Sequence, residues 1–208
     1  MDVHSTEDYL RPYREAIRRH GPGFEATLWS SPEGQRIRFD VMVDLAGFNG
    51  CAVLDIGCGR GDFAARLIER GVDFTRFTGI DALPEVIGAA KARQLPRCEF
   101  FVGDVVADPS LLKIAEVDFV CFSGSLNTMS EATARRLVQM AFETATQGVV
   151  FNFLSDRPHQ RWECQPLSPA SRFNTVAWID WSLKLTSRVT FAQDYLDGHD
   201  ATILLRHD

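Results

Sequence analysis

VLDIGCGRGDFAARL, residues 53–67, is the most informative segment for predicting the fold of this 208-residue chain. A short apolar run leads into Gly57, Gly59 and Gly61, and Asp62 then opens a segment with the apolar spacing of a helix. Glycines permit tight backbone geometry and a close approach of a ligand to the main chain. A strand, a glycine loop and a helix in this order predict the first unit of an α/β sheet, with a binding site at the loop.

On both sides of this stretch, apolar runs alternate with helical segments, as in βαβ units with a parallel sheet. Strands are expected at 51–56, 74–80, 98–104, 117–122 and 148–154, and helices at 62–70, from Pro84, at 130–146 and from near Pro169. The last two strands, 187–193 and 201–206, are joined by a short link with a turn at Asp197 and Gly198, so we expect them to be antiparallel neighbours.

The first 47 residues form a helical segment of their own. One helix is expected from Ser5, with Asp8 as its capping partner, to His20, and a second from the cap at Ser31 to Gly47. The predicted fold is therefore α/β, a doubly wound seven-stranded mixed sheet with an antiparallel last strand. It forms a single domain, with a helical cover at 1–47 and a Rossmann-like core at 48–208.

Composition and charge exclude several classes of protein. With 45% hydrophobic and 24% charged residues the chain is close to the average soluble globular domain, which excludes disorder, collagen and coiled coil. A net charge of −6 argues against nucleic acid as a partner. Neither a leader peptide nor a membrane span is apparent, and five cysteines without a CxxC spacing indicate reduced thiols. We expect a cytoplasmic protein, monomeric or homodimeric, without contact to a membrane.

The glycine loop and its acidic neighbours indicate the chemistry of the ligand. The spacing is GxGxG, with Asp62 where a dinucleotide loop has its last glycine, and there is no phosphate-binding lysine. Asp55, Asp81 and Asp104 stand at or near the ends of the first three strands, which line the ligand crevice of an open α/β sheet. An adenosine-containing ligand with a positive charge and no phosphate fits this pattern better than a nicotinamide dinucleotide does.

These segments resemble the class I S-adenosylmethionine-dependent methyltransferases. VLDIGCGRGDF (53–63), GIDALPE (79–85), FVGDV (101–105) and VDFVCFSGSLN (117–127) are similar to the four family motifs, and the terminal hairpin is similar to the family's antiparallel seventh strand. LWSSPEGQRIRF (28–39) is similar to the N-terminal segment that covers the cofactor in smaller bacterial members. The resemblance implies methyl transfer from S-adenosyl-L-methionine, with S-adenosyl-L-homocysteine as the product.

The resemblance also implies roles for individual residues. Gly57, Gly59 and the backbone around Cys58 face the methionine part of the cofactor, together with Ser123 and Gly124. Asp81 holds the ribose hydroxyls, Ala82 packs near the adenine, and Asp104 with Val105 addresses the adenine amino edge. Trp29 and Gln35 cover the cofactor, and Arg38 is a candidate partner for the methionine carboxylate.

The acceptor is expected to be a small molecule, and no catalytic residue is assigned. If it is a hydroxyl, a base is useful, and the candidates are His159, Asp156, His199 and Tyr195, with Asn127 as a residue that orients the acceptor. No histidine or cysteine set has the spacing of a metal site. Two alternatives stay open: a non-catalytic S-adenosylmethionine-binding protein shares every cofactor residue, whereas a nicotinamide-dependent oxidoreductase predicts GxGxxG and a sixth parallel strand.

Overall fold

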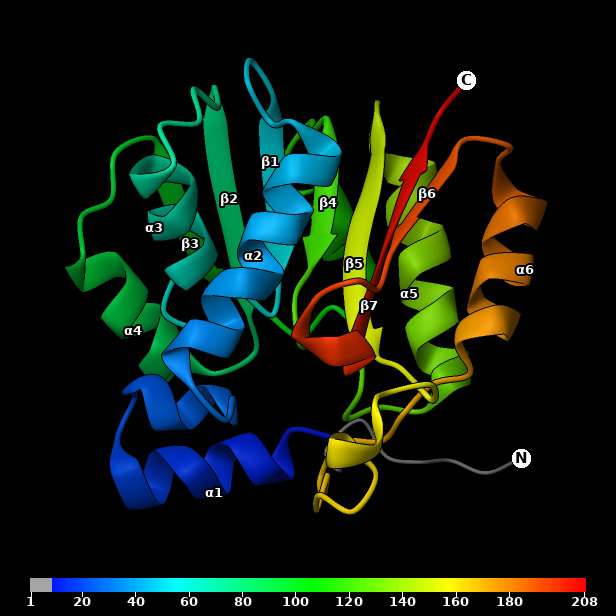
Figure 1. The fold of residues 1–208 in the computed structure, drawn as a ribbon. Helices are drawn as coiled ribbons and strands as arrows, with labels where there is room; N and C mark the ends of the chain where they lie inside the picture. The colour runs from blue at the N-terminus through cyan, green and yellow to red at the C-terminus, as the bar shows by residue number, and fades with distance from the viewer. Residues whose placement is uncertain (1–8) are drawn as a thin grey trace.

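A seven-stranded sheet forms the centre of the molecule, of which the computed structural model describes residues 9–208 (Figure 1). The strands are β1 (Ala52–Ile56), β2 (Arg76–Asp81), β3 (Cys98–Val102), β4 (Phe119–Phe122), β5 (Gly148–Leu154), β6 (Val189–Ala192) and β7 (Asp200–Arg206). Their order across the sheet is β3-β2-β1-β4-β5-β7-β6, and β7 runs antiparallel to both of its neighbours. The predicted mixed, doubly wound sheet is confirmed.

The connections between strands are helical. The α-helices are α1 (Arg11–His20), α2 (Pro32–Ala46), α3 (Asp62–Glu69), α4 (Pro84–Ala92), α5 (Glu131–Thr144) and α6 (Thr175–Leu185). Short 3-10 turns are η1 (Phe24–Thr27), η2 (Pro109–Lys113), η3 (Gln160–Trp162) and η4 (Leu196–Gly198). No helix within residues 9–208 combines the length and the apolar character that crossing a membrane requires.

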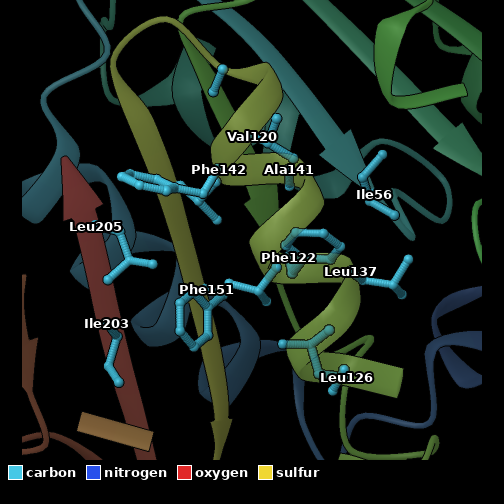
Figure 2. Packing of buried hydrophobic residues seen from close by; sticks show 14 of the residues in the cluster. Ile56, Val120, Phe122, Leu126, Leu137, Ala141, Phe142, Phe151, Ile203 and Leu205 are labelled. Atoms are coloured by element: carbon cyan, nitrogen blue, oxygen red, sulfur yellow. The ribbon is translucent and has the colours of Figure 1, made fainter. Parts of the chain in front are cut away.

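Two apolar cores lie on opposite faces of the sheet. On one face α5 and α6 pack on the sheet, and Figure 2 shows Leu137 and Ala141 of α5 among Phe122, Phe151 and their neighbours. On the other face α2, α3 and α4 pack around a group of phenylalanines that includes Phe63 and Phe77. The inner parallel strands β1, β4 and β5 are covered on both faces, so their side chains are apolar almost throughout, whereas the edge strand β3 buries only Phe100.

The helix ends follow their capping residues. Ser31 caps α2 by accepting a hydrogen bond from the Gly34 amide at 3.0 Å, as predicted. The prediction that the last helix begins near Pro169 is wrong: α6 begins at Thr175, because Asn174 caps it by accepting from the Ala177 amide at 2.8 Å. The proposed cap at Ser5 with Asp8 lies outside the described residues, and α1 itself begins at Arg11.

The N-terminal helices differ in how they meet the sheet. α2 contributes Phe39, Met42 and Val43 to the core on its face of the sheet, so most of this helix is part of the fold. α1 instead lies across the bottom of Figure 1, beyond the carboxyl ends of the parallel strands. Its Tyr13 and Ile17 pack against Ala26 and the start of α4. α1 and η1 thus form a roof, or cover, over the edge of the sheet at which the first three strands end.

Candidate active site

A cavity lies at the carboxyl ends of β1, β2, β3 and β4, beneath α1 and η1. It contains about 1020 Å³ of space outside the protein atoms, a volume that includes solvent at its mouth. Most of the residues predicted to bind the cofactor line it: Trp29, Gln35, Asp55, Gly57, Cys58, Gly59, Asp81, Ala82, Asp104, Val105, Ser123 and Gly124. Of the predicted set, Arg38 alone is not among the lining residues.

The glycine loop has the backbone conformation that its sequence requires. Gly57 and Gly59 have φ angles of +76° and +53°, a region that residues with a Cβ rarely adopt. The Asp81 carboxylate ties the loop to the end of β2, because it accepts from the Gly59 amide at 2.9 Å and from the Leu83 amide at 3.0 Å. Asp81 therefore shapes the loop as well as lining the cavity.

Asp55 is a carboxyl group in the cavity that lacks a compensating partner in the described part of the chain. Its side chain is almost fully buried, and no hydrogen-bond donor within residues 9–208 reaches its carboxylate. Burial, and after it the charge on Asp81, raises the pKa of Asp55 to about 8. Two carboxyl groups thus share one low-dielectric cavity, an arrangement that a positively charged ligand would stabilise.

Asp104 anchors the roof of the cavity. Its Oδ1 atom accepts from the Tyr9 hydroxyl at 2.6 Å and from the backbone amides of Val106 and Ala107 at 2.9 and 3.2 Å. Burial, followed by the hydrogen bond to Asp104, raises the pKa of Tyr9 well above its usual value, so the phenol keeps its proton and donates it. Nothing local in the sequence indicates that Asp104 is the partner of Tyr9.

The indole of Trp29 covers the cavity next to the loop that follows β4. Gly124 has φ +70°, and a Cβ at this position would overlap the indole of Trp29. Its amide donates to Asn152 Oδ1 at 2.8 Å, and Asn152 Nδ2 donates to Ser123 Oγ at 3.1 Å. Asn152, on β5, was missed by the sequence analysis, because a single buried amide within an apolar strand carries no motif.

Arg38 does not line the cavity. Its guanidinium is buried and donates to both carboxylate oxygens of Asp200, with Nε to Oδ1 at 2.6 Å. The Trp29 ring lies 4.4 Å from the guanidinium carbon. Arg38 thus pairs with Asp200 and contacts Trp29 without lining the cavity, and its contact with the methionine carboxylate stays a prediction.

The candidate general bases also lie elsewhere, since none of them lines the cavity: His159, Asp156, His199 and Tyr195. His199 stacks on Trp162 with ring centroids 4.1 Å apart, and burial lowers its pKa to about 4. The hydroxyl of Tyr195 shares a hydrogen bond with Thr202 at 2.6 Å. These side chains make their contacts in the C-terminal part of the fold and do not line the cavity.

Asn127 is likewise occupied by the fold. Its Nδ2 donates to the Ser171 carbonyl at 2.7 Å, and its Oδ1 accepts from the Leu154 amide at 3.0 Å. Both ends of the amide are therefore used to hold the segment before α6 against β5. The expectation that Asn127 orients an acceptor does not agree with this geometry.

Comparison with known proteins agrees with the predicted fold and family. A family model described as a methyltransferase domain matches residues 53–148. Magnesium-protoporphyrin O-methyltransferase of Rhodobacter capsulatus is 38% identical over 170 residues, which cover 76% of this chain and 66% of that protein, so the chain spans a little under two thirds of its relative.

Solved structures share the architecture at low identity. An O-methyltransferase family protein from Burkholderia thailandensis has a TM-score of 0.71 at 16% identity, covering 99% of this chain and 66% of that one. Magnesium protoporphyrin IX methyltransferase from Synechocystis PCC 6803, with S-adenosylhomocysteine bound, has a TM-score of 0.66 at 15% identity, covering 97% of both chains. The chain belongs to the class I S-adenosylmethionine-dependent methyltransferase family.

Proposed function

We propose that the cavity binds S-adenosylmethionine and that the chain transfers the methyl group of this cofactor to a small-molecule acceptor. The observation that carries the proposal is the buried Asp55 carboxyl group, which has no donor among residues 9–208 and lines the cavity together with a glycine loop held by Asp81. A cationic cofactor without phosphates would satisfy both carboxyl groups, whereas the phosphates of a dinucleotide would be repelled by them.

Each part of the cofactor has candidate partners in the cavity. Asp81 would accept hydrogen bonds from the ribose hydroxyls, and Ala82 would pack near the adenine. Asp104 and Val105 would address the adenine amino edge, with Tyr9 held beside them by its hydrogen bond to Asp104. These assignments follow the family resemblance, and the shared cavity supports them.

The methionine part would lie at the other end of the same cavity. Gly57, Cys58 and Gly59 would approach it through their backbone, and Ser123 and Gly124 would border it under Trp29. The small loop residues leave room there for a ligand to approach the main chain.

The chain contributes positioning and exclusion of water more than proton transfer. The cofactor supplies an electrophilic methyl group, so that transfer is an in-line displacement that depends on alignment. Tyr9, Tyr13 and Trp29 cover the cavity, and a cationic ligand would favour the ionised form of the Asp55 carboxyl group. Among the residues that line the cavity, Asp55, Asp62, Asp81 and Asp104 are acids, and all four are placed to hold the ligand or the loop.

An oxygen acceptor on a small molecule is the first to test. The relative from Rhodobacter capsulatus is a magnesium-protoporphyrin O-methyltransferase, which makes magnesium-protoporphyrin a suitable first acceptor. The net charge of −6 favours a small molecule over nucleic acid.

The buried thiols of Cys51, Cys58 and Cys121 favour a cytoplasmic location. A monomer or homodimer stays a prediction, to be tested by light scattering.

Calorimetric titration tests the cofactor, and labelled methyl transfer tests the reaction. Binding of S-adenosylmethionine and S-adenosylhomocysteine, without binding of NAD, is expected. Saturable binding of NAD with no response to the other two ligands would overturn the proposal. Cofactor binding without transfer to any acceptor in a broad screen that includes an RNA oligonucleotide would favour a non-catalytic binding protein.

A further inference from the structure

A second hollow adjoins the cavity and opens to solvent. We call it the α1 groove: it lies between α1, the residues 128–133 that lead into α5, and the Ser168–Pro169 turn. It contains about 2010 Å³ of space outside the protein atoms, including open solvent. The α1 groove and the cavity share four wall residues: Tyr9, Trp29, Val106 and Met129. A molecule in the groove would therefore touch the same side chains as a ligand in the cavity.

We propose that the α1 groove is the acceptor site and that the acceptor carries an anionic group, which Arg11 and Arg19 contact. The inference rests on the proposed function, because an acceptor must reach the cofactor from a side that the cofactor does not fill. The shared wall of Tyr9, Trp29 and Met129 is where the two molecules would meet. The α1 groove would thus be the part of the site that selects the substrate.

The charge of α1 supports an anionic group. This helix carries four arginines, Arg11, Arg14, Arg18 and Arg19, against the single acid Glu15, in a chain whose net charge is −6. Two of the arginines border the groove. A basic helix at the mouth of a site on an acidic protein attracts anions locally.

Arg11 and Arg19 have N–H donors in addition to those that contact Glu15. Arg11 Nε lies 3.1 Å and Arg19 Nη2 lies 3.9 Å from the carboxylate of Glu15, so one acid is shared between two guanidinium groups. Their side chains are 74% and 69% exposed, and exposed pairs of this kind are worth little. A guanidinium can bind a carboxylate or phosphate in a bidentate manner, so an incoming anion can replace or join Glu15.

The other residues that line the α1 groove indicate the chemistry of the rest of the acceptor. Leu28, Trp29 and Met129 provide apolar surface close to the cavity, so the reacting end of the acceptor is expected to be carried on an apolar body. Thr128, Ser130 and Thr133 line the groove and bring hydroxyl groups to it. Glu25 also borders the groove and opposes an acceptor that is anionic along its whole length. The structure thus favours an amphipathic organic anion.

The test compares acids with their neutral counterparts. The probes are magnesium-protoporphyrin and a set of aromatic and aliphatic hydroxycarboxylic acids, with labelled S-adenosylmethionine as methyl donor. Each hydroxy acid is compared with its primary amide, so that the hydroxyl group that would accept the methyl is the same in both. The variants are Arg11→Gln, Arg19→Gln and the double variant. Arg18→Gln is the matched control, because Arg18 is an exposed arginine of the same helix that does not border the groove.

The expected result is methylation of at least one acid in preference to its amide. In the double variant, the KM for that acid rises by about ten-fold or more, with a smaller change in kcat, because the lost contacts are charged hydrogen bonds to the bound substrate. Arg18→Gln retains the wild-type KM. Calorimetry with the protein saturated with S-adenosylhomocysteine adds an equilibrium measurement: binding of the acid weakens with salt in the wild type and much less in the double variant.

Three results would overturn the inference. These are equal methylation of acids and amides, an equal loss in Arg18→Gln and the double variant, and methylation of none of the acids by protein that binds the cofactor. Failure of the proposed function is a different observation, since protein without affinity for S-adenosylmethionine would fail in the cofactor titration before any acceptor is added.

Discussion

Replacing Asp55 with asparagine removes one ionisable group from the cavity and keeps the size of the side chain. In the protein without cofactor, burial raises the pKa of this carboxyl from 3.8 to about 8. The folded state therefore holds the proton more tightly than the unfolded state does. The stability that this proton contributes is fully present below pH 3.8 and is lost as the pH rises through about 8.

The size of the effect follows from the shift. Between pH 5 and 7, Asp55 is ionised in the unfolded chain and protonated in the folded one, so each pH unit lowers the free energy of unfolding by about 1.4 kcal/mol. The wild type is expected to lose about 3 kcal/mol over these two units from Asp55 alone. Asp55→Asn lacks this loss, so it gains stability relative to the wild type as the pH rises.

Urea unfolding of both proteins at pH 5, 6 and 7, without cofactor, measures the difference. Other groups that titrate are common to the two proteins and cancel when their free energies are subtracted at each pH. A constant offset between wild type and variant reflects the amide itself and leaves the reasoning intact. The same pH dependence in both proteins would refute it, because Asp55 would then be ionised in the folded state as it is in the unfolded chain.

Three further substitutions test the other parts of the site. Asp81→Ala should weaken the binding of S-adenosylmethionine by about 1.5 to 3 kcal/mol, the range for a charged hydrogen bond, and an unchanged calorimetric affinity would remove Asp81 from the site. Asp200→Asn leaves the buried Arg38 guanidinium without a charged partner, so urea unfolding should show a loss of about 3 to 5 kcal/mol; a loss below about 1 kcal/mol would contradict the role of this pair. Gly124→Ala places a Cβ against Trp29 at φ +70°, which should cost about 1 to 3 kcal/mol of stability and weaken cofactor binding, whereas wild-type values for both would show that Trp29 moves freely.

Much of the fold could be predicted from local patterns. Apolar runs mark the strands, the loop of Gly57, Gly59 and Gly61 marks the first strand-to-helix turn, and Ser31 marks the start of α2. Where a stronger cap was overlooked, the prediction shifted: Asn174 starts α6 later than Pro169 would. Capping and turn formation depend on residues within a few positions of one another, so sequence is sufficient for them.

The cofactor residues were predictable for a related reason. Asp55, Asp81 and Asp104 lie at or near the ends of parallel strands, and the carboxyl ends of such strands meet at one edge of the sheet. The same topology brings Ser123 and Gly124 there after β4. A residue's position along a strand of known direction thus determines which edge of the sheet it reaches, whatever lies between the strands.

Sequence alone is enough to predict the sheet, its glycine loop and the row of carboxylates at the strand ends, since each depends on periodicity or on near neighbours. The partners of long side chains are known only from the folded structure. Arg38 pairs with Asp200, 162 positions away, and Tyr9 with Asp104, 95 positions away. Such pairs depend on how segments distant in the chain pack together, and a flexible side chain has many acceptors within reach until that packing is known. For this reason the roof of the cavity and the α1 groove appear only in three dimensions.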